Sequence, residues 1–116
     1  MENRRREGQR KEQTAEAYLT GLGYEILERN YRCRQGEIDL IGRDDRCLVF
    51  IEVKYRKNSR FGLPAEAVDQ RKQNRIIYTA RHYLMSKGYS SLTPCRFDVV
   101  SILGSEITVL KDAFGL

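Results

Sequence analysis

The spacing of apolar and polar residues along this chain predicts two helices and five strands. Apolar residues recur three and four positions apart over 12–22 and again over 65–87, which is the period of a helix with one buried side. In the first of these segments the apolar stripe consists of Ala15, Tyr18, Leu19 and Leu22. Segments rich in β-branched and aromatic residues predict strands over 24–31, 37–42, 47–54, 97–103 and 107–110.

The predicted elements follow one another in the order α-β-β-β-α-β-β, which indicates a mixed β-sheet in an α/β or α+β arrangement. With 116 residues, of which 41% are hydrophobic, the chain has the size and composition of one domain. We expect this single domain to span 12–116. A basic segment over 1–11 precedes it and forms either an arm or the start of the first helix.

The second and third predicted strands can pair as a hairpin, with its turn expected at Asp44 and Asp45. Side chains alternate between the two faces of a strand, so one face of this hairpin is apolar and belongs against a core. The other face carries charged residues at one end and large apolar residues at the other: Glu37, Asp39, Glu52 and Lys54, then Ile41, Leu48 and Phe50. In this register Glu37 lies opposite Glu52, and Asp39 is the diagonal neighbour of Glu52, so both could reach one ion.

The charged end of this hairpin has the residue types of a magnesium or manganese site. Hard divalent cations prefer carboxylate and carbonyl oxygens, and buried carboxylates are costly unless something neutralises them. We therefore expect Asp39 and Glu52, with the backbone carbonyl of Val53, to hold Mg²⁺ or Mn²⁺, and Lys54 to act as the catalytic cation. Glu12 could complete the site or could be an ordinary solvated helix residue. The alternative is an exposed strand face on which Lys54 pairs with Glu52.

An excess of basic residues, with a formal net charge of +5, suits a polyanionic partner such as nucleic acid. Arg56, Lys57 and Arg60 lie directly after the hairpin, in a predicted loop beside the acidic cluster. Arg75 adds a further basic side chain from the second helix. Lys72 lies on the apolar stripe of that helix, where it either extends toward solvent or points to an acidic or phosphate-bearing site.

Several classes of protein are excluded by features that the sequence lacks. It has no run of about 18 apolar residues that would predict a membrane span, and residues 1–11 lack the apolar segment of a secretory signal. Cys33, Cys47 and Cys95 form no C-x-x-C pair, and with a single histidine a structural zinc site is not expected. We expect a cytoplasmic protein with reduced cysteines and no membrane partner.

Beyond these patterns, a longer string of residues resembles a known family. The D-x12-E-x-K spacing of Asp39, Glu52 and Lys54 is similar to that of the PD-(D/E)XK nucleases. Over 8–114 the chain further resembles the YraN family of small bacterial proteins, at Glu12, Tyr18-Leu19, Gly23-Tyr24, 26–27, 29–32, 36–41, 50–54, Arg56, 61–62, 66–68, Lys72, Ala80, Tyr83-Leu84 and 96–100. That family is similar in turn to archaeal Holliday junction resolvases.

This resemblance implies a restriction-endonuclease-like fold, in which helices cover both faces of a mixed sheet. It also implies a Mg²⁺- or Mn²⁺-dependent endonuclease acting on DNA, including branched or otherwise structured DNA. The catalytic positions that it implies are Glu12, Asp39, Glu52 and Lys54. For contacts with nucleic acid we expect Arg56, Lys57, Arg60, Lys72 and Arg75.

Two other functions stay open, namely a nucleic-acid-binding module without catalysis and an adaptor for an acidic protein partner. A homodimer is a further expectation, because the related resolvases are dimers.

Overall fold

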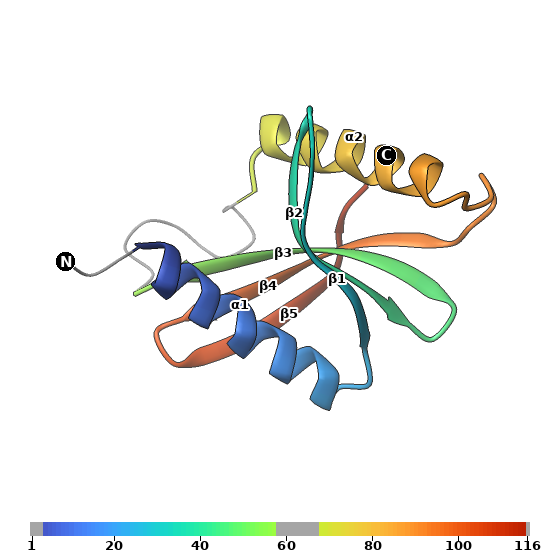
Figure 1. Cartoon of the computed structure of the whole chain (residues 1–116). Coiled ribbons are helices and arrows are strands. Elements are labelled where there is room, and N and C mark those ends of the chain that lie inside the picture. The colour runs from blue at the N-terminus through green and yellow to red at the C-terminus, as the bar shows by residue number, and fades with distance from the viewer. Residues whose placement is uncertain (1–3, 58–67, 116) are drawn as a thin grey trace.

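The computed structural model describes residues 4–57 and 68–115, which form two helices and a five-stranded sheet (Figure 1). In chain order the elements are α1 (Arg4–Gly21), β1 (Glu25–Cys33), β2 (Gly36–Asp44), β3 (Cys47–Arg56), α2 (Gln70–Ser86), β4 (Cys95–Leu103) and β5 (Glu106–Phe114). The element order and the α/β class expected from the sequence are confirmed.

The sheet is mixed, and its strands lie in the order β1-β2-β3-β4-β5. Strands β3 and β4 are parallel, because α2 connects them, whereas every other neighbouring pair is antiparallel. In Figure 1, α2 lies above the sheet and α1 below it, so the two helices cover opposite faces. This confirms a mixed sheet flanked by helices.

Two apolar layers result from this arrangement. Between the sheet and α2, Phe50 packs near Tyr83 and Phe97, all of them buried. Between the sheet and α1, Ala15 and Leu19 are completely buried. The rest of the stripe predicted for α1 is exposed, because Tyr18 and Leu22 keep 38% and 51% of their surface. The alternating pattern of β3 therefore serves two cores, one on each face.

The hairpin of β2 and β3 turns one residue later than the sequence predicted. Asp44 pairs with Cys47, so the turn consists of Asp45 and Arg46. Asp45 has a φ of 57°, a left-handed conformation that aspartate tolerates. Asp44 instead belongs to the strand, where its carboxylate accepts a hydrogen bond from Arg96 at 2.8 Å.

This shift changes cross-strand partners but leaves each side chain on its face. Leu40 pairs with Ile51, so continuing that register sets Asp39 beside Glu52. The prediction that Glu37 lies opposite Glu52 is wrong. A slide by two residues preserves the alternation of a strand, and the acids therefore remain on the face expected of them.

Both helices begin at residues other than those expected. α1 starts at Arg4, so residues 4–11 belong to the helix, which was the second alternative drawn from the sequence. The second helix was expected to begin at residue 65, and residues 65–67 of that expected helix lie outside the described residues. Val68 and Asp69 precede the helix, and α2 starts at Gln70. The side chain of Asp69 caps α2 by accepting the backbone N–H of Lys72 at 2.8 Å.

A buried charge network around Asp98 ties β4 to its surroundings. Asp98 is fully buried, and its carboxylate accepts hydrogen bonds from Arg96 Nε at 2.9 Å and from the Tyr24 hydroxyl at 2.7 Å. It also accepts the backbone N–H of Asp112 at 2.9 Å, which fixes β5 against β4. A buried carboxylate is tolerated here because every oxygen has a partner.

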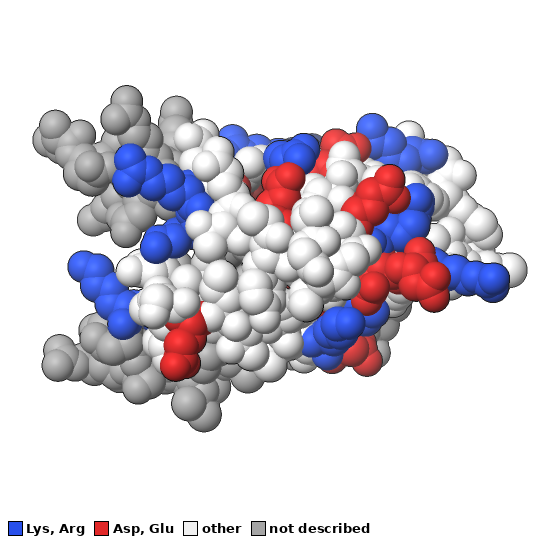
Figure 2. Space-filling view, turned by 90° about the horizontal axis from the view of Figure 1, so that it is seen from below, with Lys and Arg blue, Asp and Glu red and all other residues white. Residues whose placement is uncertain are grey.

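The face seen from below in Figure 2 has a largely uncharged middle, with basic and acidic groups around it.

Neither α1 nor α2, as far as the structure describes them, has the length and apolarity needed to cross a membrane.

Candidate active site at the fork of strands β2 and β3

The centre of the site is the point where β2 parts from β3. The ladder between them runs from the pair Asp44–Cys47 to the pair Leu40–Ile51. Beyond it the tip of the β1–β2 hairpin packs against α2, where a Cβ added to Gly36 would lie 3.3 Å from the Thr79 hydroxyl. The parting strands leave a fork that is open toward the pocket.

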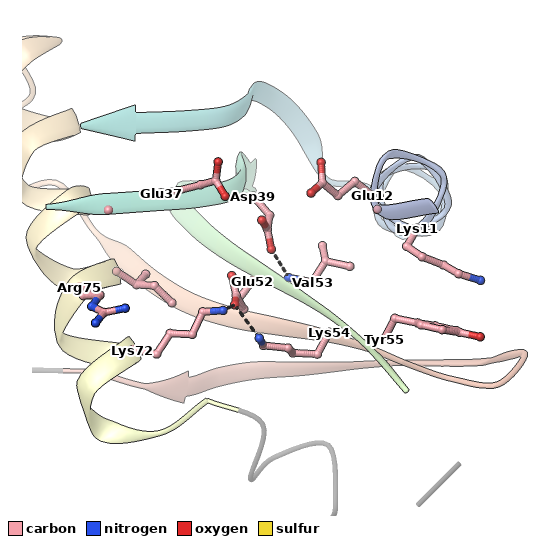
Figure 3. Close-up of a pocket in the computed structure, with 13 residues that line it drawn as sticks. Lys11, Glu12, Glu37, Asp39, Glu52, Val53, Lys54, Tyr55, Lys72 and Arg75 are labelled. Carbon is pink, nitrogen blue, oxygen red and sulfur yellow. Dashed lines mark hydrogen bonds and ion pairs between the residues drawn. The ribbon is translucent and has the colours of Figure 1, made fainter. Parts of the chain in front are cut away.

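Asp39 lies at this fork, where the backbone of β2 no longer pairs with β3. Its side chain takes the place of the backbone acceptor that β2 would otherwise supply. Its Oδ2 accepts the backbone N–H of Val53 at 2.8 Å. The N–H and C=O of a strand residue leave on the same side, so the carbonyl of Val53 faces the fork as well. Asp39, Glu52 and Val53 all line one pocket, and in Figure 3 the two carboxylates point into the space between the strands.

Glu52 is nearly buried and is held by two lysines. Its side chain is 5% exposed, and its Oε2 lies 2.6 Å from Lys72 Nζ and 3.3 Å from Lys54 Nζ. Lys54 comes from the same strand, two residues on, whereas Lys72 reaches across from the first turn of α2 (Figure 3). Of the two alternatives for Lys72, the side chain points to an acidic site.

The carboxyl group of Asp39 is harder to ionise than usual. Burial is the main cause that raises its pKa to about 8, and the charge of Glu52 and a shared hydrogen bond between the two carboxyls add to it. The N–H of Val53 acts in the other direction, because it stabilises the carboxylate. The closeness of the two carboxyl groups therefore opposes the negative charge of Asp39.

The two lysines respond differently to this surrounding. Burial lowers the pKa of Lys54, and the neighbouring Lys72 lowers it further. Burial also opposes the charge of Lys72, but its contacts with Glu52 and Lys54 and the charge of Asp39 together outweigh this and raise its pKa. Lys72 therefore holds its proton more firmly, while Lys54 is the more easily deprotonated amine.

Glu12 joins the site from α1, on the other side of the fork. It is half-buried and lines the same pocket, pointing toward Asp39 in Figure 3. Burial raises its pKa, and the charges of Glu37 and Glu52 raise it further. Of the two alternatives for Glu12, its position agrees with a residue of the site, because α1 brings the acid to the pocket wall.

The pocket at the fork has a volume of about 510 Å³ and is walled by both helices. The sequence did not point to two of its residues, Gly8 and Lys11, whereas Tyr55 follows Lys54 beside the expected site. The ammonium of Lys11 lies 4.0 Å from the centre of the Tyr55 ring, a cation–π contact. Gly8 leaves the α1 wall open, since a Cβ there would meet nothing within 4 Å. Only the i, i+3 spacing of Gly8 and Lys11 on one side of α1 could have suggested this wall.

The basic residues predicted to contact nucleic acid fall into two groups. Lys72 and Arg75 line the pocket. Arg56 at the end of β3 and Lys57 directly after it are not among the described residues that line it. Arg60 lies outside the described residues.

The residues at the fork fit a hard divalent cation that keeps part of its water. Within 4–57 and 68–115, no three acidic, histidine or cysteine side chains gather closely enough to bind a metal by themselves. Mg²⁺, however, often takes only one or two carboxylates and retains several waters. Asp39, Glu52 and the carbonyl of Val53 would hold it, while Lys72 and Lys54 now neutralise Glu52.

Comparison with known proteins identifies relatives along almost the whole chain. Residues 11–102, which include all four predicted catalytic positions, match the model of the uncharacterised protein family UPF0102. A UPF0102 protein of Lachnoclostridium phytofermentans is 52% identical over 112 residues, which cover 97% of this chain and 95% of the relative. One of Nitrosococcus oceani is 46% identical over 114 residues, covering 95% and 92%. Another, of Symbiobacterium thermophilum, is 51% identical over 98 residues, covering 84% and 82%. The chain therefore belongs to the UPF0102 family, which is the YraN family that its sequence resembles.

Proposed function

We propose that this protein is an endonuclease that hydrolyses phosphodiester bonds in DNA with the help of Mg²⁺ or Mn²⁺. The observation that carries the proposal is the convergence of Asp39 and Glu52 at the fork, with Lys54 beside them. The D-x12-E-x-K spacing of these residues is similar to that of the PD-(D/E)XK nucleases, whose fold likewise has helices on both faces of a mixed sheet.

Each residue at the fork has a chemical task in this reaction. Asp39 and Glu52 would hold the cation, which would supply Lewis acidity toward a phosphate oxygen and make a water more acidic. The amine of Lys54, whose pKa burial lowers, can take the proton of the attacking water or, when charged, stabilise the negative charge that grows on phosphorus. Glu12 adds a second acid that can orient water from the α1 side.

The substrate expected from the surroundings of the fork is a nucleic acid backbone. The pocket carries cationic groups on both sides of its acids, Lys11 from α1 and Lys72 and Arg75 from α2. Phosphates on either side of the scissile bond could contact these groups. The similarity of the family to archaeal Holliday junction resolvases favours branched DNA.

The test is cleavage of end-labelled DNA by purified protein with Mn²⁺, Mg²⁺ or EDTA. Four-way junction, flap, duplex and single-stranded substrates, and an RNA flap, separate the substrate classes. We expect nicking of branched DNA that requires the metal. Asp39→Asn and Lys54→Ala should reduce the rate at least about a hundredfold, which is the usual loss when a group that stabilises the transition state is removed.

Matched controls come from the turn of the same hairpin. Asp45→Asn and Arg46→Ala change an acid and a base that are exposed at the far end of β2 and β3, and they should cleave like the wild type. Equal cleavage by wild type and Asp39→Asn would mean that the activity comes from a contaminant and would refute the proposal.

A nucleic-acid-binding module without catalysis is the second candidate. It is favoured by the two lysines that already neutralise Glu52, because a site satisfied in this way does not need a cation. This candidate predicts DNA binding that weakens with salt and survives Glu52→Gln, with no cleavage under any metal.

A further inference from the structure

One short ion pair, between Lys72 and Glu52 of the pocket wall, joins two groups that the proposed reaction would need apart. Lys72 Nζ lies 2.6 Å from Glu52 Oε2, and this carboxylate is 5% exposed. Lys54 contacts the same oxygen from 3.3 Å. Because the Glu52 carboxylate is nearly buried, water screens these contacts less than it would at the surface. Glu52 is thus bound from the α2 side before any external cation arrives.

The charges around the fork leave little room for a dication beside both lysines. The Glu52 carboxylate lies directly at both ammonium groups, 2.6 Å from Lys72 Nζ and 3.3 Å from Lys54 Nζ. A divalent cation on Glu52 would then face two like charges at close range, and such repulsion disfavours binding. One ammonium group has to withdraw for the cation to bind well.

We propose that Lys72 occupies the place of the divalent cation on Glu52 and has to release this carboxylate before a cation binds, so that Lys72 sets the metal affinity of the site. This inference rests on the proposed function, since it concerns the same cation. It adds a regulating residue from α2 to a site otherwise built on the sheet and α1.

Lys72 is better placed to withdraw than Lys54. Its side chain is 40% exposed, compared with 26% for Lys54. It lies in the first turn of α2, whose backbone is fixed there by the Asp69 cap. Four rotatable bonds separate its ammonium from that backbone, so it can turn to the pocket mouth without movement of the helix.

The released ammonium would remain useful at the mouth of the pocket. Arg75, one turn further along α2, lines the same wall. Lys72 turned toward it would add a second cationic group for a backbone phosphate. The exchange therefore couples the arrival of the metal to the exposure of a phosphate contact on α2.

The test is the affinity for Mn²⁺ alone, measured by electron paramagnetic resonance of free Mn²⁺ and by calorimetry, without nucleic acid. We expect Lys72→Gln to bind Mn²⁺ at least about tenfold more tightly than the wild type, since it removes a competing charge in a partly buried site. Lys72→Arg keeps the charge and should bind like the wild type. Arg71→Gln is the matched control, because it removes one positive charge from the next residue, which is exposed.

A second measurement uses the wild type itself and does not depend on a variant that folds. The ¹⁵Nζ resonance of Lys72 should move from its ion-paired position toward that of a solvated amine as Mg²⁺ is added. An unchanged resonance at saturating Mg²⁺ would overturn the inference, as would equal Mn²⁺ affinity of wild type and Lys72→Gln. A gain shared by Arg71→Gln would point to general electrostatics and would overturn it too.

The outcomes separate this inference from the proposed function. Tighter Mn²⁺ binding by Lys72→Gln without any DNA cleavage refutes the nuclease and leaves the role of Lys72 intact. If the wild type cleaves DNA with metal but binds Mn²⁺ as tightly as Lys72→Gln, the role of Lys72 is refuted and the nuclease is not. Absence of Mn²⁺ binding in both proteins refutes both.

Discussion

Replacing Asp39 by asparagine should change how the stability of the metal-free protein depends on pH. Burial, with the charge of Glu52, raises the pKa of this carboxyl from 3.8 to about 8. Asparagine resembles the protonated acid, because it is neutral and its amide oxygen can accept the N–H of Val53 as Asp39 does at 2.8 Å. The variant therefore keeps the contacts of the fork and removes the titration.

The sign and the size of the effect follow from proton binding. Between the two pKa values, the folded protein holds a proton that the unfolded chain has released, so the free energy of unfolding falls as the pH rises. One proton of difference is worth about 1.4 kcal/mol per pH unit. From about pH 5 to about pH 7 the wild type should thus lose about 2.7 kcal/mol of stability relative to Asp39→Asn.

The measurement is urea unfolding of wild type and Asp39→Asn at several pH values, with EDTA present. Other titrating groups, such as Glu12, affect both proteins and largely cancel in the difference. Asp45→Asn is the control, because Asp45 is exposed in the turn of the same hairpin and should show no such slope. The reasoning is refuted if wild type and Asp39→Asn keep a constant difference over this range, or if the wild type gains stability as the pH rises.

Three further substitutions test the architecture around the site, each by urea unfolding. Gly8→Ala should raise the free energy of unfolding by about 0.5–1 kcal/mol, because alanine favours the helix and its Cβ meets nothing within 4 Å; a loss of stability would show that this wall is packed. Gly42→Ala should lower the free energy of unfolding by about 1–3 kcal/mol, because its Cβ would lie 2.8 Å from the backbone oxygen of Glu25; an unchanged value would mean that β1 moves freely there. Arg96→Met should lower it by about 3–5 kcal/mol, because the buried carboxylate of Asp98 loses its counter-ion, and a neutral result would contradict the network.

The sequence predicted which face of the hairpin carries the acids and Lys54, although it placed the turn one residue too early. Alternation along a strand has a period of two, so a slide by two residues exchanges partners without exchanging faces. Asp39, Glu52 and Lys54 were therefore assigned to the right side for a reason independent of the turn. Asp44 belongs to the strand and pairs there with Arg96, and no local pattern reveals that distant partner.

The helix contributions to the site were harder to predict, because they depend on how the layers pack. Lys72 lies on the apolar stripe of its helix, and this position alone does not show whether its side chain extends to solvent or to an acidic site. The contact with Glu52 depends on how α2 packs over the sheet. Lys11 and Tyr55 are far apart in the sequence and meet only because α1 crosses the end of β3. The position of one residue on a helix or strand does not predict which distant residue its side chain will contact.

The walls of the pocket have a consequence for the motion of the whole chain. Lys11 and Glu12 belong to a helix under the sheet, and Lys72 and Arg75 to a helix above it, yet all four face one cavity. An occupant long enough to touch both walls would act as a crosslink between the two layers, and the amino-terminal halves of α1 and α2 would open as one cooperative unit. Amide hydrogen exchange in these two halves should then slow together when the cavity is filled, while the carboxyl-terminal halves keep their own rates.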